Sequence, residues 1–139
     1  METFRIETEI TVFGVQADSF PQGVQQAWET LHKLLPAKEG RTFYGISHGT
    51  RQGGIIYSAC VEEAFPGEAN RFGCKAIMLS KGEYLGETIL GFKNQEQKIG
   101  ETFQEILGRN NYDEKGCCVE WYKSNNEVLC MVKKKDGVA

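Results

Sequence analysis

The chain of 139 residues is 40% hydrophobic and 25% charged, which is the balance of one globular domain with its own core and argues against a disordered chain. Its formal net charge is −3, and its dense basic run, 133–135, stands at the end of an expected strand, so direct contact with nucleic acid is not expected. Because no apolar run approaches the roughly 20 residues of a membrane span and residues 1–10 lack the apolar stretch of a signal peptide, we expect a soluble, cytoplasmic protein.

The first half of the chain predicts one strand, one helix and two further strands. Its first segment alternates apolar and charged residues, as a strand does. Its second places apolar residues at helical spacing from Val24 to Leu35, just before Pro36. Two short apolar segments then flank the polar, glycine-rich turn 48–54, and a loop rich in glycine follows at 65–73. The expected elements are strand Phe4–Val12, helix 20–35, strand Thr42–Ser47 and strand Ile55–Glu62.

The second half predicts the same order again. Asn94 and Gln97 resemble the capping box that opens a helix, and Ile99, Phe103 and Ile106 form the apolar face of that helix. Extended apolar segments lie on both sides of it. The expected elements are strand Cys74–Leu79, strand Glu83–Leu90, a helix between Asn94 and Gly108, strand Cys117–Lys123 and strand Glu127–Lys134.

A strand–helix–strand–strand unit therefore occurs twice in a single domain over 1–139, with half-repeats at about 3–64 and 74–135. The repeat is visible in the pattern of apolar residues rather than in residue identity. Each half alone has too small a core, so we expect an α+β fold, an antiparallel sheet with two helices packed on one side. Because pockets favour the junction of half-domains, we expect a ligand groove at the pseudo-twofold axis.

The cysteines and histidines predict neither a disulfide framework nor a metal site. The cysteines are odd in number and form no C-x-x-C pair, so we expect reduced thiols that act as small apolar strand residues. A catalytic cysteine nucleophile is not excluded by the sequence, although its usual histidine and asparagine or aspartate partners cannot be identified either. Ligand spacing for zinc is absent, and neither histidine suits haem, so no cofactor is expected. These residues are Cys60, Cys74, Cys117, Cys118, Cys130, His32 and His48.

A carboxylate stands in an otherwise apolar strand near the C-terminus. Strand alternation places Val119 and Trp121 on one face, and Cys118, Glu120 and Tyr122 on the other. If the first face packs on the helices, Glu120 lies on the opposite face of the sheet. Two interpretations stay open there: a solvated surface group, or a poorly solvated carboxylate in an aromatic groove. The second would bind a cationic ligand, with cation–π attraction from tyrosine rings.

Three short segments spread along the chain together match the sequence pattern of a known family. They are Tyr44-Gly45-Ile46-Ser47, Gly82-Glu83-Tyr84, and Val119-Glu120-Trp121-Tyr122 followed by Asn125-Asn126. In these segments and in its element order, from about Phe4 to Lys134, the chain resembles the GyrI-like family. This is the effector-binding domain of multidrug-sensing regulators and of stand-alone bacterial proteins. The resemblance implies a duplicated fold with a ligand groove, in which Glu120 is the recognition carboxylate and Tyr122 and Tyr84 lie beside it.

Two further tyrosines are candidate ligand contacts. Tyr44 stands in the first half roughly where Glu120 stands in the second, so pseudo-symmetry would bring it to the groove. Tyr57 lies on the next strand. For both, ordinary packing in a half-buried sheet is an equally good explanation. Trp28 has apolar partners at helical spacing and is expected in the core.

Three functions remain open. The leading hypothesis is the binding of hydrophobic, cationic small organic molecules, for effector or drug sensing or for sequestration, since the chain shows no DNA-binding module. The second is a hydrolase that acts on strained or electrophilic small molecules, with Glu120 as general base. The third is a protein-interaction module of the gyrase-inhibitor type, with an unidentified partner.

Overall fold

The fold consists of two compact units. The computed structural model describes residues 1–135. Unit 1 combines Met1–Thr8 with the chain from Ser80 onward, and unit 2 is the continuous segment Glu9–Leu79. Unit 1 is thus assembled from two separate parts of the chain, whereas unit 2 is inserted between them.

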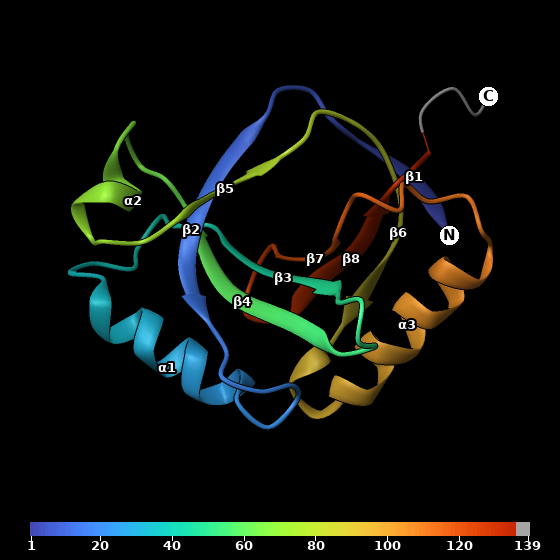
Figure 1. Cartoon of the computed structure of the whole chain (residues 1–139), viewed down its shortest axis with the longest axis horizontal. Helices are drawn as coiled ribbons and strands as arrows, with labels where there is room; N and C mark the ends of the chain where they lie inside the picture. Colours follow the sequence, from blue (N-terminus) through green and yellow to red (C-terminus); the bar gives the residue numbers. More distant parts are fainter. Residues whose placement is uncertain (136–139) are drawn as a thin grey trace. The chain divides into compact units, whose positions relative to one another are not determined.

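Unit 1 is a four-stranded antiparallel sheet with one helix packed on it (Figure 1). Its elements are β1 (Glu2–Ile6), β6 (Gly82–Leu90), the 3₁₀ helix η1 (Phe92–Asn94), α3 (Glu96–Gly108), β7 (Cys118–Tyr122) and β8 (Glu127–Lys133). The strand order is β1-β6-β8-β7, and α3 lies against β6 and β8. Phe103 and Ile106 of α3 pack on Ile89, Val128 and Val132 of the sheet. Each such buried side chain contributes about 1.5–3 kcal/mol of hydrophobic stabilisation.

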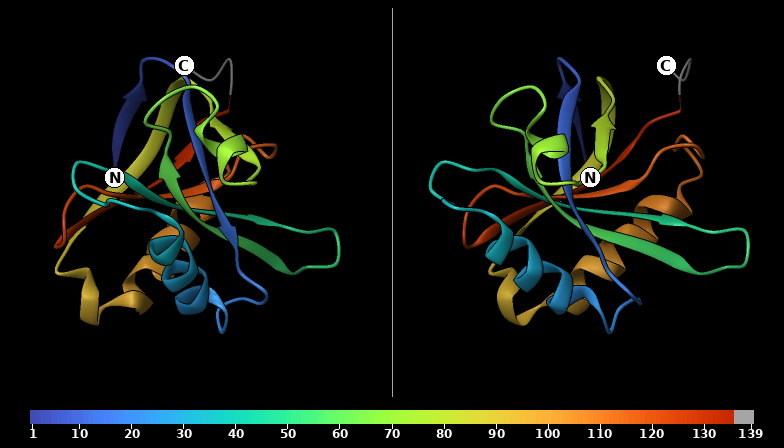
Figure 2. Two further views of the ribbon diagram at one scale, coloured as in Figure 1. Left: turned by 90° about the vertical axis from the view of Figure 1, so that its left-hand side faces the viewer. Right: turned by 60° about the vertical axis from the view of Figure 1, so that its left-hand side comes forward.

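Unit 2 repeats this plan. Its elements are β2 (Ile10–Gln16), α1 (Val24–Leu34), β3 (Phe43–Gly49), β4 (Ile55–Glu62), α2 (Glu68–Arg71) and β5 (Ala76–Leu79). The strand order is β3-β4-β2-β5, all antiparallel, and α1 lies against β2 and β4. Strands β3 and β4 form a long hairpin that extends beyond the rest of the unit (Figure 2). The α+β class, the antiparallel sheets and the repeated strand–helix–strand–strand order are as predicted.

The two long helices end and pack as their sequences dictate. Ala27 and Leu31, one turn apart, are buried on the sheet side of α1. Pro36 follows Leu35, whose backbone is extended at φ −84° and ψ 128°, because the residue before a proline is forced out of the helical region. The prediction of a capping box at Asn94 is wrong. Asn94 belongs to η1, and the N-cap of α3 is Gln95, which makes no side-chain capping hydrogen bond.

The strand expected over Phe4–Val12 is two strands in two different units. β1 pairs with β6 of unit 1, whereas β2 pairs with β4 and β5 of unit 2. The chain passes from unit 1 into unit 2 at 7–9. Likewise β5, expected to open the second half, pairs with β2 of unit 2. The second copy of the strand–helix–strand–strand repeat, which lies in unit 1, therefore starts at β6 and not at β5.

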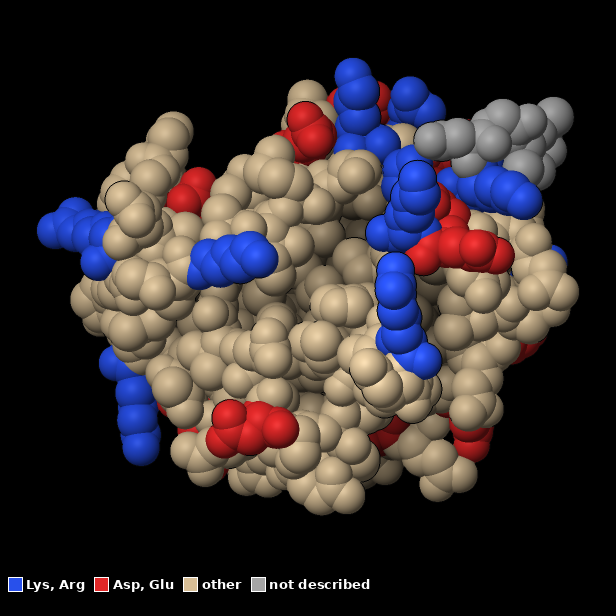
Figure 3. All heavy atoms as spheres, viewed as in Figure 1, with Lys and Arg blue, Asp and Glu red and all other residues tan. Residues whose placement is uncertain are grey.

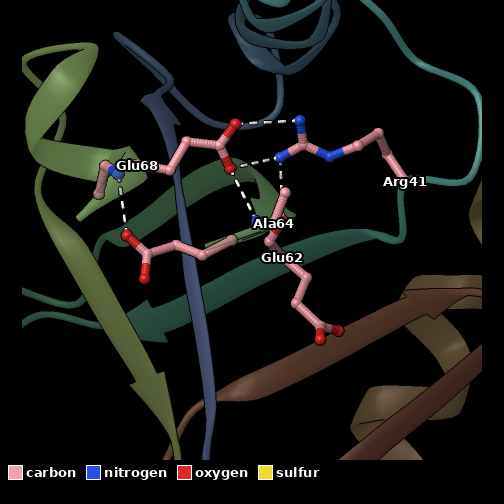
Figure 4. A network of polar contacts seen from close by, with 6 residues as sticks. Arg41, Glu62, Ala64 and Glu68 are labelled. Carbon is pink, nitrogen blue, oxygen red and sulfur yellow. Dashed lines mark hydrogen bonds and ion pairs between the residues drawn. The ribbon is translucent and has the colours of Figure 1, made fainter. Parts of the chain in front are cut away.

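The segment between β4 and β5 was expected to be a loop, and it contains the short helix α2. A network of hydrogen bonds fixes the position of this segment. The Glu68 carboxylate, only 4% exposed, accepts hydrogen bonds from Arg41 Nη1 at 3.1 Å and Nη2 at 2.7 Å. It also accepts one from the Ala64 amide at 2.8 Å. Arg41 Nη2 donates in addition to the Glu62 carbonyl at 3.0 Å (Figure 4). We call these four residues the Arg41–Glu68 clamp.

The repeat has one clear residue-level signature. The registers align Gly14 of β2 with Gly86 of β6, because Gly14 pairs with Cys60 and Gly86 with Met131, the equivalent positions on β4 and β8. At both glycines the neighbouring strand comes too close for a side chain. A Cβ on Gly14 would lie 1.8 Å from the Ala59 carbonyl oxygen, and one on Gly86 would lie 2.5 Å from that of Cys130.

Candidate ligand-binding site

Glu120 lies on the side of its sheet that faces the helix, so the condition under which it would lie on the opposite face, with Val119 and Trp121 packed on the helices, is not met. β7 pairs Glu120 with Cys130, which belongs to the core cluster packed on α3, and the alternate residues Cys118 and Tyr122 pack against the same cluster. The other face is covered as well, since Val119 is fully buried. Because both Val119 and Glu120 are buried, the alternation of side chains along β7 could not show which face meets the helix.

The carboxylate and its neighbouring tyrosine form a hydrogen-bonded pair within one strand. Glu120 is 8% exposed, and the Tyr122 hydroxyl donates to its Oε1 at 2.5 Å. The two residues are two positions apart and therefore on the same face of β7. The Tyr122 ring contacts Phe92 of η1 edge-on, with ring centroids 5.2 Å apart. Burial of a carboxylate is costly unless hydrogen bonds or a positive charge compensate it.

The same row of the sheet continues with Cys130 and Glu87, on β8 and β6. Burial, and then the charges of Glu120, Cys118 and Glu87, raise the pKa of Cys130 to about 12. Burial also raises the pKa of Cys117, to about 11. None of the five cysteines forms a disulfide bond. Because nucleophilic attack needs the thiolate, neither Cys117 nor Cys130 is set up for covalent catalysis near neutral pH.

Tyr84 belongs to unit 1 but lies on the other face of the sheet. It pairs with Lys133, whose neighbour Val132 points toward α3, so that Tyr84 and Lys133 point away from it. Its side chain is buried, and its hydroxyl donates to the Ser80 carbonyl at 2.7 Å. Burial, and then Cys117 and Asp113, raise the pKa of Tyr84 to about 12. Within unit 1, Glu120 and Tyr122 thus meet, whereas Tyr84 lies on the opposite face.

Tyr44 and Tyr57 belong to unit 2 and occupy opposite faces of its sheet. Tyr44 is fully buried, and its hydroxyl donates to Glu62 Oε1 at 3.1 Å. Burial, and then the charge and hydrogen bond of Glu62, raise the pKa of Tyr44. Tyr44 pairs with Cys60 and points away from α1, whereas Glu120 points toward α3, so the two residues occupy different faces in their units.

Tyr57 is part of an aromatic cluster on the helix side of unit 2. Its hydroxyl accepts a hydrogen bond from Trp28 Nε1 at 3.1 Å. Phe20 stacks on its ring with centroids 5.9 Å apart, although Phe20 itself is 41% exposed. Trp28 is half-buried and packs against the unit 2 core, as expected.

Two neighbours of the predicted residues could not have been found from sequence patterns. Phe92 holds the Tyr122 ring from a 3₁₀ turn that has no periodic signal, and Phe20 covers Tyr57 from the irregular segment before α1. Only the strand registers and the path of these turns bring the rings together.

Within residues 1–135, no cluster of three or more His, Cys, Asp or Glu side chains is placed to hold a metal ion. No helix in that range has both the length and the apolar character to cross a membrane. On the face shown in Figure 3, the described basic side chains are scattered or lie beside acidic ones, without a continuous basic stripe.

Neither a protein family model nor a curated protein matches this chain. Solved structures do. An integron cassette protein from the mobile metagenome of Vibrio cholerae is 17% identical with a TM-score of 0.66, covering 96% of this chain and 95% of that one. The protein SAV2435, solved bound to tetraphenylphosphonium, is also 17% identical with a TM-score of 0.66, covering 95% and 93%. A hydrolase from Listeria innocua is 12% identical with a TM-score of 0.58, covering 96% and 92%.

At these identities the likeness shows the fold. It is consistent with the GyrI-like fold that the sequence resemblance predicts, an α+β architecture built on antiparallel sheets.

Proposed function

We propose that this protein binds hydrophobic organic cations and that the Glu120 carboxylate recognises their positive charge. The observation that carries the proposal is the burial of this carboxylate in β7, 8% exposed, beside the Tyr122 hydroxyl. A charge withdrawn from water is stabilised by an opposite charge that enters the same low-dielectric setting. A cation with an apolar body supplies that charge at a lower desolvation cost than a small hydrated ion does.

The neighbouring structures support the same ligand class. SAV2435, which shares the fold, is bound to tetraphenylphosphonium, a positive charge surrounded by four phenyl groups. Tyr122 offers an aromatic ring next to the carboxylate, and a cation over such a ring gains about 0.5–2 kcal/mol. Tyr84, Tyr44 and Tyr57 stay proposed ligand contacts. All three are almost fully covered by protein, so a ligand reaches their rings only when covering side chains move; Phe20 is such a side chain for Tyr57.

Calorimetric titration with two ions of the same shape and opposite charge tests this proposal. Wild-type protein is expected to bind tetraphenylphosphonium and not tetraphenylborate. Glu120→Gln keeps the side-chain size but removes the charge, and should weaken tetraphenylphosphonium binding about 10- to 100-fold, the value of a buried charged contact. Glu114→Gln is the matched control, because Glu114 is an exposed glutamate of unit 1 and the net charge changes equally. Equal affinity of wild type and Glu120→Gln would refute the role of Glu120.

A second candidate is hydrolysis of strained or electrophilic small molecules. It is favoured by the fold shared with the Listeria innocua hydrolase and by a buried carboxylate, a group that serves as a general base in many enzymes. An epoxide such as styrene oxide is a suitable probe, since water adds across one C–O bond to give a diol. Diol release by wild type, lost in Glu120→Gln while that variant still binds the probe, would establish catalysis. Binding without turnover in both proteins would leave the binding function alone.

A further inference from the structure

Strand β5 stands at the end of the strand order of unit 2, and among residues 1–135 it pairs with β2 alone (Figure 1). In an antiparallel edge strand, every second residue directs its peptide N–H and C=O groups away from the neighbouring strand. No other strand of the described chain pairs with these groups of β5. Such an edge is a template on which a further strand can form.

The equivalent edge strand of unit 1 carries charged side chains. Because the registers align Gly14 with Gly86, β1 is the equivalent of β5, and Arg5 occupies the position of Met78. The Arg5 side chain is 59% exposed and stands opposite Glu83 of β6. Charged side chains are one of the devices that prevent an edge strand from pairing with another chain. The edge of unit 1 is therefore protected.

The edge of unit 2 lacks this protection. β5 contains neither a charged residue nor a proline, and its four residues pair with β2 in an unbroken register. Met78 is 52% exposed, and Ala76, two positions earlier on the same face, is exposed as well. The Met78 sulfur accepts a hydrogen bond from the Thr11 hydroxyl at 3.0 Å. A flexible apolar side chain, of a type that adapts to differently shaped partners, thus lies where unit 1 has an arginine.

Positive charge lies at the beginning of β5. Lys75 directly precedes the strand, Arg71 stands four residues earlier in α2, and both are exposed. The register, continued by one residue, aligns Lys75 with Glu2 of β1, so this end has opposite charges in the two units. Antiparallel pairing is the more stable kind, and a strand paired antiparallel with β5 has its C-terminal end beside Lys75. Carboxylates at that end complement the charge of this edge.

We infer that the edge of β5 binds an extended peptide segment of another protein, which adds an antiparallel strand with apolar side chains beside Met78 and carboxylates near its C-terminal end. Main-chain hydrogen bonds give such strand addition its affinity, and alternate side chains give it specificity. A second copy of this chain is a poorer occupant. Antiparallel pairing of two β5 strands brings Ser80 and Lys81 of one chain, and no carboxylate, to Lys75 of the other. The inference is independent of the proposed function, because β5 belongs to unit 2 and Glu120 to unit 1.

Fluorescence anisotropy with the synthetic peptide TVTVTVDD, labelled at its N-terminus, tests the inference. Wild-type protein should bind this peptide, and a version with proline in place of the central valine should not bind, because proline cannot donate a main-chain hydrogen bond. Met78→Arg gives β5 the arginine of β1 and should weaken binding about tenfold or more, the effect of one lost apolar contact. Leu90→Arg is the matched control, since Leu90 is a strand residue of unit 1 that is 63% exposed. It should bind the peptide as wild type does.

Lys75→Glu tests the direction of the bound strand. It should weaken binding of TVTVTVDD about two- to fivefold, the value of an exposed ion pair, and strengthen binding of TVTVTVKK by a similar factor. Lys98→Glu, at an exposed position of α3, changes the net charge equally and should keep the preference for the acidic peptide.

Three results would overturn the inference. The first is a wild-type protein that does not bind TVTVTVDD, and the second is equal binding by wild type and Met78→Arg. The third is a wild-type dimer in sedimentation velocity that Met78→Arg converts to a monomer, since a second copy would then occupy the edge. Met78→Arg should still bind tetraphenylphosphonium as wild type does, so failure of the proposed function is seen separately.

Discussion

His32 places a titratable ring among aromatic side chains near the end of α1. Its ring centroid lies 5.1 Å from that of Phe43 and 6.2 Å from that of Trp28. Its Nδ1 atom is buried and has no hydrogen-bond partner within the described residues. Burial, and then the positive charge of Lys38, lower the pKa of His32 below its ordinary value of 6.5. This outweighs the C-terminal end of the helix dipole, which favours a protonated histidine.

The lowered pKa of His32 predicts a loss of stability in mild acid. Between the two pKa values the unfolded chain binds a proton that the folded chain refuses, so the unfolding free energy falls as pH drops below about 6.5. Urea unfolding at pH 7.5 and pH 5.5 should show this fall in wild type and a smaller one in His32→Phe. His48→Asn, at an exposed position near the end of β3, should behave as wild type. Identical pH dependence in wild type and His32→Phe would contradict the assignment.

At the scale of single residues, the sequence revealed which side chain to examine but not where it points. A glutamate within an apolar strand is unusual enough to identify Glu120, and alternation correctly groups it with Tyr122. Alternation left open whether Val119 and Trp121 or the face with Glu120 meets the helix. The true face depends on Cys130 and Val132 of β8, and thus on a register that no local pattern contains.

At the scale of elements, the Arg41–Glu68 clamp stabilises α2, a helix of four residues that is too short to be held by apolar packing alone. Burial acts to raise the pKa of Glu68, but the Ala64 amide and the Arg41 guanidinium hold it below its ordinary value of 4.5. The stabilisation from Glu68 is therefore present above about pH 4.5 and is lost as the pH falls below it. Arg41 makes a two-pronged contact that lysine cannot reproduce.

Removal of the clamp's cation should destabilise unit 2. Arg41→Met leaves a buried carboxylate without its partner and should cost about 1–3 kcal/mol of unfolding free energy. Glu68→Gln keeps an acceptor for the Ala64 amide, so the double variant should lose less than the sum of the two single losses. Arg51→Met, at an exposed turn, serves as the matched control. Additive losses in urea unfolding would show that the two side chains do not act together.

Helices and strands with a clear periodic pattern of apolar residues could be predicted from the sequence. Elements whose limits depend on contacts with distant parts of the chain could not. β4 has the predicted bounds, and α1 lies within the predicted range because its apolar spacing and Pro36 are local signals. The division of Phe4–Val12 was hidden, since Ile6, Ile10 and Val12 keep one parity across the break. Because β1 and β2 differ in their pairing partners but not in their alternation, the pattern does not show the break. α2 is too short to show a period and depends on Arg41, 27 residues earlier.

At the scale of the whole molecule, the equivalence of Gly14 and Gly86 shows that both units are built on the same close approach of two strands. Neither glycine has a positive φ, so the requirement is for space rather than for an unusual backbone. On β2 the atoms that a Cβ would meet are backbone atoms of Ala59 and Cys60. On β6 the nearest atoms are the Cys130 carbonyl oxygen at 2.5 Å and Met131 Cβ at 2.9 Å, which are less close than the 1.8 Å contact on β2. The same substitution should therefore cost more in unit 2 than in unit 1.

Alanine substitutions at the two positions test this common design. Gly14→Ala should lower the unfolding free energy by about 3 kcal/mol or more, and Gly86→Ala by about 1–3 kcal/mol, the range of overpacked cores. Gly100→Ala in α3 is the control, because nothing lies within 4 Å of its Cβ. It should stabilise the helix by about 0.5–1 kcal/mol. Trp28 reports on unit 2 and Trp121 on unit 1, so fluorescence during urea unfolding locates each effect. A neutral Gly14→Ala would mean that the strands can separate freely, and the shared glycine would then be a coincidence of sequence rather than a requirement of the fold.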